Sequence, residues 1–94
     1  MEELHYKIVT RPGDVIRVHL SGSAANVLVM DDLNYASYKS GKTYNYYGGY
    51  YTRTPVRIKP AIYGQLNVVI NLGGLAGSVR AVVQIVHPRA PRRR

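Results

Sequence analysis

Four segments of this chain alternate between apolar and polar residues with a period of two: residues 15–20, 54–59, 66–70 and 79–85. Side chains on a β-strand point alternately to opposite faces of the sheet, so this period indicates half-buried strands. Turn residues separate the segments, as in Arg11-Pro12-Gly13-Asp14 and Ser21-Gly22-Ser23. No long helical period is present. The pattern therefore predicts an all-β fold of seven or eight short strands, an antiparallel sandwich or a small barrel.

The remaining segments complete this prediction. Residues 4–9 are expected to form a first strand, and residues 25–30, apolar on both faces, a central strand. Residues 32–40 are predicted to form the one short helix, with an Asp as its cap and with Leu33, Ala36, Tyr35 and Tyr38 facing inward. Residues 43–47 are predicted to be a strand that Gly48-Gly49 interrupts with a bulge, a turn or a close backbone approach. Pro55 and Pro60 favour an edge position for residues 54–59.

The alternation also assigns faces. Val56 and Ile58 are expected to point inward and Arg57 and Lys59 outward, while Asn67 and Asn71 face away from their apolar neighbours. Outward valines on the last strands indicate a second covered face, formed by the other sheet or by another subunit: Val69, Val82 and Val86. Because exposed apolar stripes usually mark contacts, we expect a homo-oligomer.

The chain as a whole is predicted to be one domain, residues 1–87, followed by a disordered tail, residues 88–94, which holds four of the thirteen Lys and Arg residues. It contains no Cys, so a thiolate site is excluded. No apolar run follows the first Met, and none approaches the roughly 20 residues of a membrane span. We therefore expect a soluble, cytoplasmic protein that does not associate with membranes.

Residues that could carry catalysis are poorly placed. None of the three histidines (His5, His19, His87) has another ligand at metal-binding spacing. Asp31 and Asp32 are adjacent, and adjacent residues of a strand point to opposite faces, so they make a poor acid–base pair. We therefore predict no enzymatic activity, no metal and no cofactor.

A binding surface is easier to identify. From Leu33 to Arg94 the chain has no Asp or Glu, and seven of its nine tyrosines lie between Tyr35 and Tyr51. Cations attract phosphates, and aromatic faces stack on bases. The predicted ligand-binding residues are Lys42, Tyr44, Tyr46, Tyr47, Tyr50, Tyr51, Arg53 and Arg57. The alternative is that tyrosines supply the aromatic core volume, because Phe and Trp are absent. Tyr6, Tyr63 and one or two of Tyr35 and Tyr38 would then be buried.

Several blocks of sequence occur together in order: Leu20-Ser21-Gly22-Ser23-Ala24-Ala25-Asn26-Val27, Tyr46-Tyr47-Gly48-Gly49, Thr54-Pro55-Val56-Arg57, and Asn67-Val68-Val69-Ile70-Asn71-Leu72-Gly73-Gly74. With these blocks the chain resembles a bacterial family known as domain of unknown function 1883. The resemblance implies a small jelly-roll-like β-sandwich. Members of that family occur alone or joined to Toll/interleukin-receptor-type domains linked to antiphage defence. The family has no agreed catalytic residues.

Three functions remain open at this point. The first is a non-enzymatic binding module for a phosphate-bearing ligand, a nucleotide or a nucleotide-derived immune signal, which the protein senses or sequesters in a bacterial or phage defence setting. The second is a structural or interaction protein that oligomerises or docks onto a larger defence protein. The third is nucleic-acid binding through the basic-aromatic face and the Arg tail.

Overall fold

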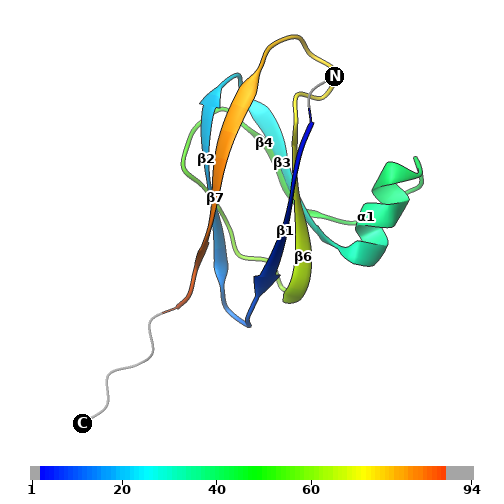
Figure 1. The fold of residues 1–94 in the computed structure, drawn as a ribbon, viewed down its shortest axis with the longest axis vertical. Helices are drawn as coiled ribbons and strands as arrows, with labels where there is room; N and C mark the ends of the chain where they lie inside the picture. The colour runs from blue at the N-terminus through cyan, green and yellow to red at the C-terminus, as the bar shows by residue number, and fades with distance from the viewer. Residues whose placement is uncertain (1–2, 89–94) are drawn as a thin grey trace.

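The fold is a β-sandwich, as predicted. The computed structural model describes residues 3–88, and Figure 1 shows two facing sheets with one short helix outside them. Seven strands and the helix follow in the order β1 (Glu3–Thr10), β2 (Val15–Gly22), β3 (Ala25–Asp31), α1 (Asp32–Lys39), β4 (Tyr47–Tyr51), β5 (Val56–Ile58), β6 (Gly64–Asn71) and β7 (Val79–Val86).

Two antiparallel sheets make up the sandwich. The four-stranded sheet has the order β1-β6-β3-β4, and the three-stranded sheet has the order β5-β2-β7. Their facing sides enclose the main core, in which every member is buried: Ile16, Val18, Ala25, Val27, Val29, Val56, Ile58, Leu66, Val68, Ile70, Leu72 and Val79. The period-two alternation is the reason: one parity of each strand supplies this layer and the other parity faces away.

Two predictions about individual strands are confirmed. The strand that is apolar on both faces, β3, lies inside its sheet between β6 and β4. The proline-flanked segment becomes β5, an edge strand whose Val56 and Ile58 are buried while Arg57 is exposed. Proline lacks the N–H that a sheet ladder needs, so it is tolerated at the ends of such a strand.

Helix α1 begins where predicted, but only two of its four predicted inward residues face the sheet. Its N-cap is Asp31, whose Oδ1 accepts a hydrogen bond from the backbone N–H of Asn34 at 2.8 Å. The prediction that Leu33 and Ala36 face inward is wrong, since Leu33 is 78% exposed and Ala36 is exposed as well. The prediction is confirmed for Tyr35 and Tyr38, which face the sheet, three residues apart on one side of the helix.

Part of the outer face of the four-stranded sheet, over β3 and β6, is consequently covered by α1. Leu28, Met30 and Val69 form a second buried cluster there, against which Tyr35 and Tyr38 pack. Val69 is completely buried. Its cover is the helix of the same chain, which corrects the prediction that the other sheet or another subunit covers it. Val69 therefore gives no support to an oligomer.

Two asparagines lie under the helix, on the side that the alternation predicts. Asn67 is completely buried and Asn71 is 8% exposed. Asn67 Nδ2 donates to Asp32 Oδ1 at 2.8 Å and to the Met30 carbonyl at 3.4 Å, and its Oδ1 bonds the His5 ring at 2.8 Å. A buried amide is costly unless it is hydrogen-bonded, so these contacts make its burial tolerable.

Asn71 extends the polar layer. Its Oδ1 accepts from Asn26 Nδ2 at 3.0 Å, and its Nδ2 donates to the Tyr38 hydroxyl at 3.0 Å. The Tyr38 hydroxyl in turn donates to Glu3 Oε1 at 2.6 Å. Two kinds of contact therefore hold α1 against β1 and β6: these hydrogen bonds and the small apolar cluster.

The strand predicted at residues 43–47 is misplaced, because β4 starts at Tyr47 and runs through both glycines. Gly48 has a φ of +127°, and a Cβ there would overlap the carbonyl oxygen of Val27 on the neighbouring strand. This confirms the close backbone approach that was one of the predicted alternatives. Gly49 has open space around its Cβ position.

Two remaining expectations concern the ends of the chain and the membrane. Apart from Pro88, the predicted disordered tail lies outside the described residues. Within residues 3–88, no helix has the length and apolar character needed to cross a membrane.

Candidate functional site

Two of the five tyrosines predicted to bind ligand are packing residues. Tyr44 packs against the cluster under α1, and its ring meets Tyr38 edge-on with centroids 5.1 Å apart. Tyr51 packs against the main core. The alternative that tyrosines supply aromatic core volume fits these two, together with Tyr6. It fails for Tyr63, which is 62% exposed.

The other three predicted tyrosines are accessible. Tyr46 is 47%, Tyr47 37% and Tyr50 54% exposed. Tyr46 and Tyr47 line a cavity of about 280 Å³ between the start of α1, β4 and the connection from β5 to β6. Tyr50 pairs with Asn26 of β3, on the side of the sheet away from the main core.

The three predicted cations lie in three different places. Lys42 is exposed in the turn after α1, where its backbone N–H donates to the Ser37 carbonyl at 2.9 Å. Arg53 follows β4, and Arg57 lies on β5 in the opposite sheet. The structure therefore does not gather the eight predicted residues into one site.

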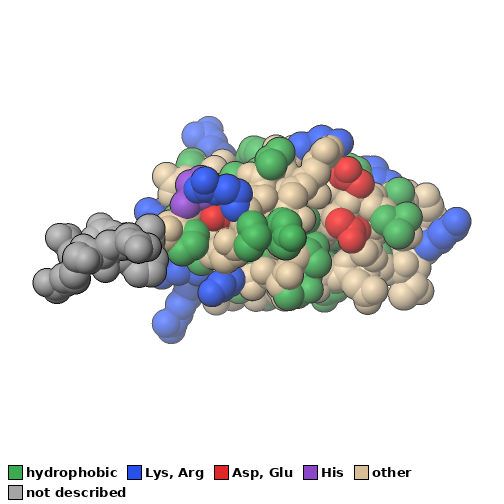
Figure 2. All heavy atoms as spheres, turned by 90° about the horizontal axis from the view of Figure 1, so that it is seen from below, with side chains coloured by type: hydrophobic (Ala, Val, Ile, Leu, Met, Phe, Trp, Pro, Cys, Tyr) green, Lys and Arg blue, Asp and Glu red, His purple; other side chains and the backbone are tan. Residues whose placement is uncertain are grey.

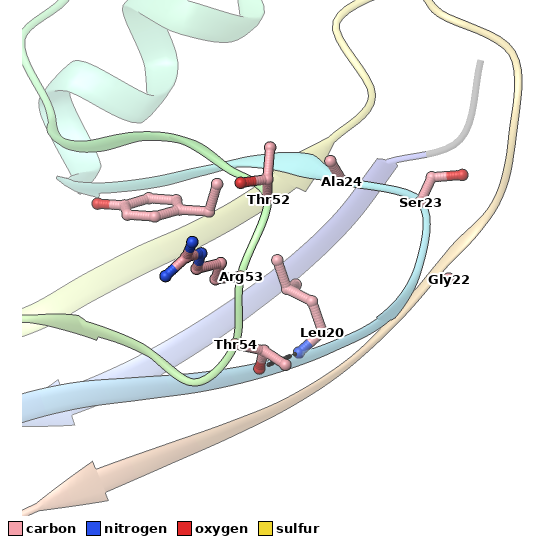
Figure 3. Close-up of a pocket in the computed structure, with 8 residues that line it drawn as sticks. Leu20, Gly22, Ser23, Ala24, Thr52, Arg53 and Thr54 are labelled. Carbon is pink, nitrogen blue, oxygen red and sulfur yellow. Dashed lines mark hydrogen bonds between the residues drawn. The ribbon is translucent and has the colours of Figure 1, made fainter.

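The pocket beside Arg53 is small. Figure 3 shows Arg53, Thr52 and Thr54 on one segment, across from Leu20 and the Gly22–Ala24 turn. Thr54 Oγ1 accepts a hydrogen bond from the Leu20 backbone N–H at 2.9 Å, which ties the two segments together. The volume is about 50 Å³, enough for a few water molecules but not for a nucleotide.

A different basic surface is formed by the outer side of the three-stranded sheet. Arg17 on β2 is directly opposite Arg57 on β5 and directly opposite Gln84 on β7. The next outward pairs are His19 with Val82 and Ser21 with Arg80. We call this surface the basic face: Arg17, His19, Arg57, Arg80, Val82, Gln84 and Val86.

The charge of the basic face is not balanced from within the sheet. No outward-facing residue of β5, β2 or β7 is Asp or Glu. Arg17 Nε donates to His19 Nε2 at 3.3 Å, a contact between two basic groups. Arg57 is among the ligand-binding residues predicted from the sequence, whereas Arg17 is not. The alternation of Ile16, Arg17 and Val18 was visible, whereas the pairing of β2 with β5 was not.

The two described groups with shifted pKa values, Tyr38 and Asp14, make hydrogen bonds that join segments of the fold. Burial and the hydrogen bond to Glu3 raise the pKa of Tyr38 to about 12. Asp14 is buried at the turn before β2, where its Oδ2 accepts from the Arg11 backbone N–H and its Oδ1 bonds His87 Nδ1, both at 2.7 Å. In the part of the chain that the structure describes, no three His, Asp or Glu residues are grouped as a metal site.

Asp14 should make the free energy of unfolding depend on pH in the acid range. Burial by itself raises the pKa of this carboxyl, but the hydrogen bonds from Arg11 and His87 and the positive charges of both outweigh it, so the pKa lies below its ordinary value. The native state thus favours the carboxylate. The stabilisation is complete above about pH 4, the ordinary pKa, and is lost as pH falls through the native pKa. In urea titrations, wild type and Asp14→Asn should differ most near neutral pH and converge in acid. Parallel stability curves would contradict this assignment.

Comparison with known proteins gives one family assignment. The sequence model of the family described as "Domain of unknown function (DUF1883)" matches residues 1–89. The searches of curated proteins and of solved structures found no match.

Proposed function

The chain belongs to the DUF1883 family, and we propose that it is a non-enzymatic binding module for a phosphate-bearing ligand held on the basic face. The observation that carries the proposal is the cross-strand pair of Arg17 and Arg57. Like charges directly opposite on neighbouring strands destabilise a sheet. An anion bound between the two guanidinium groups would relieve that repulsion.

Arginine suits such a ligand. Its planar guanidinium presents N–H donors in a fork that matches phosphate oxygens in pairs. Gln84 adds an amide beside Arg17, and Arg80 adds a further cation one pair beyond His19. We favour a nucleotide or a nucleotide-derived signal as the ligand. A nucleic acid strand offers the same phosphate chemistry and would show a steeper dependence on salt.

Removing the paired charges should weaken binding. We expect Arg17→Gln and Arg57→Gln each to lower the affinity for ADP, ADP-ribose or a short oligonucleotide by at least about tenfold, since a hydrogen bond to a charged group contributes roughly 1.5–3 kcal/mol. Isothermal titration calorimetry at low and at physiological salt measures this loss and separates a mononucleotide from a polyanion.

Arg53→Gln is the matched control, because it removes the same charge from an exposed arginine away from the basic face. It should leave the affinity within about twofold if local contacts decide binding, since exposed charges are screened beyond about 8 Å at physiological salt. Equal weakening by all three variants would mean that only net charge matters, and no binding of any probe would overturn the proposal.

A second candidate function is protein association through the same face. Val82 is 58% and Val86 40% exposed there, beside the arginines. A mixed apolar and Arg surface is common in the centre of protein interfaces. Light scattering tests this second candidate. An oligomer that Val82→Glu converts to a monomer would support association through the basic face. A monomeric mass at high protein concentration would contradict a homo-oligomer.

A further inference from the structure

The cavity beside Tyr46 and Tyr47 has a lining unlike that of the basic face. Met30, only 1% exposed, and Ile62 supply apolar atoms, and the two tyrosines supply aromatic surface. Its polar lining residues are Asp31, Asn34 and Asn45. The volume of about 280 Å³ lies at the lower limit of ordinary ligand pockets, which suits one or two rings. We call this cavity the tyrosine groove.

Its position at one end of the sandwich follows from the strands. Met30 and Asp31 end β3, where the chain passes into α1, and Tyr47 begins β4. Figure 2 looks onto the lower end of the molecule in Figure 1, the end where α1 begins, and it shows hydrophobic side chains near acidic ones there. The basic face shares no residue with this groove.

The groove is held in place by its own contacts. Asn34 Oδ1 accepts from the Asn45 backbone N–H at 2.8 Å, which fastens the loop before β4 to the helix. The Tyr46 ring packs against the Tyr44 ring, with a distance of 5.7 Å between the centroids and an angle of 41° between the planes. A site whose side chains are already ordered loses less conformational freedom when it binds a ligand.

The lining also restricts the charge of a ligand. It contains one carboxylate, that of Asp31, and no Lys, Arg or His. Asp31 Oδ1 accepts from the backbone N–H and from Nδ2 of Asn34. Its Oδ2 accepts no hydrogen bond from residues 3–88, so it can accept one from a ligand. A phosphate at this place would be repelled, whereas a hydroxyl or amino group would be bound.

We propose that the tyrosine groove is a second binding site, specific for an uncharged ring that offers a flat apolar face to the tyrosines and hydrogen-bond donors to Asp31. Aromatic side chains stack on such faces. A nucleoside and a sugar share this chemistry, and the experiment distinguishes them. The site is independent of the phosphate-binding proposal.

The test uses adenosine, methyl glucoside and AMP as probes, with amide chemical shifts recorded on the full chain. Adenosine, or the glucoside if the ring is a sugar, should shift residues 30–34, 45–47 and 62. AMP should bind the groove more weakly than adenosine, because its phosphate meets Asp31. Shifts confined to other regions, or none at millimolar probe, would overturn the proposal.

Substitutions locate the site further. Tyr46→Ala should weaken binding of the shifting probe by about tenfold, the usual effect of losing one stacking ring. Tyr50→Ala is the matched control: it removes an exposed tyrosine of β4 that does not line the groove. It should leave binding within about twofold, and equal losses would overturn the assignment. Arg17→Gln, on the basic face, should leave adenosine binding to the groove unchanged. The two proposed sites can therefore be supported or contradicted independently.

Discussion

Gly48→Ala should lower the free energy of unfolding by at least about 3 kcal/mol, because it combines a strained φ, which costs roughly 1–3 kcal/mol, with a backbone overlap. The φ of +127° is one that L side chains rarely adopt, and the new Cβ would overlap the Val27 carbonyl oxygen. The obstacle is backbone, so it cannot move aside as a side chain would. A loss of about 3 kcal/mol corresponds to a fall of roughly 12–24 °C in Tm for a domain of this length, measurable by calorimetry.

The adjacent glycine provides the control. Gly49→Ala places its Cβ in open space and at a φ that is not in the positive range, so it should change stability by less than about 1 kcal/mol. Similar losses at both positions would mean that the strand needs flexibility throughout, and the close approach of Gly48 to β3 would then not be the cause.

Asn67→Leu should also be severely destabilising, by about 3 kcal/mol, since it leaves buried polar partners unpaired. The substitution keeps the branched shape and the number of side-chain heavy atoms but removes the contacts to His5, Asp32 and the Met30 carbonyl. If α1 loosens as a result, Tyr38 becomes more accessible, and its pKa should fall from about 12 toward the ordinary value near 10. Urea unfolding measures the first effect and ultraviolet titration of the tyrosines the second.

Gln65→Leu is the corresponding control. Gln65 lies on the same strand and the same side of the sheet, two residues before Asn67, but it is exposed. A surface substitution of this kind should stay within about 0.5 kcal/mol. If Asn67→Leu proved equally harmless, the polar layer under α1 would not contribute to stability.

Most of the strands could be predicted because their information is local. The alternation in β2, β5 and β7 shows which parity is buried, and the apolar run of β3 shows that both faces are covered. The element that covers the outer side of β3, helix α1, could not be predicted from such a local pattern. The sheet-facing side of α1 is determined by the contacts of Tyr38 with Glu3 and of Tyr35 with His5, which span thirty or more residues of sequence.

The candidate site could be predicted only in part for a related reason. Seven tyrosines are close in sequence, but the chain between Tyr35 and Tyr51 passes through a helix, a loop and a strand. It therefore distributes them over a buried cluster, the main core and the surface. The Arg17–Arg57 pair has the opposite property: forty residues separate its members, and only the register of β2 with β5 brings them together.

The helix layer and the sandwich core should respond differently to temperature. Separating the two sheets would expose a large interior whose buried members are all aliphatic, and such exposure dominates the heat capacity change of unfolding. Lifting α1 would expose three buried apolar side chains together with amides and hydroxyls, which change the heat capacity in the opposite sense. Cooling weakens hydrophobic burial, so it acts mainly on the sandwich. Contacts between α1 and the sheet should therefore lose less stability on cooling than the sandwich core does. Their share of the total stability is expected to rise in the cold.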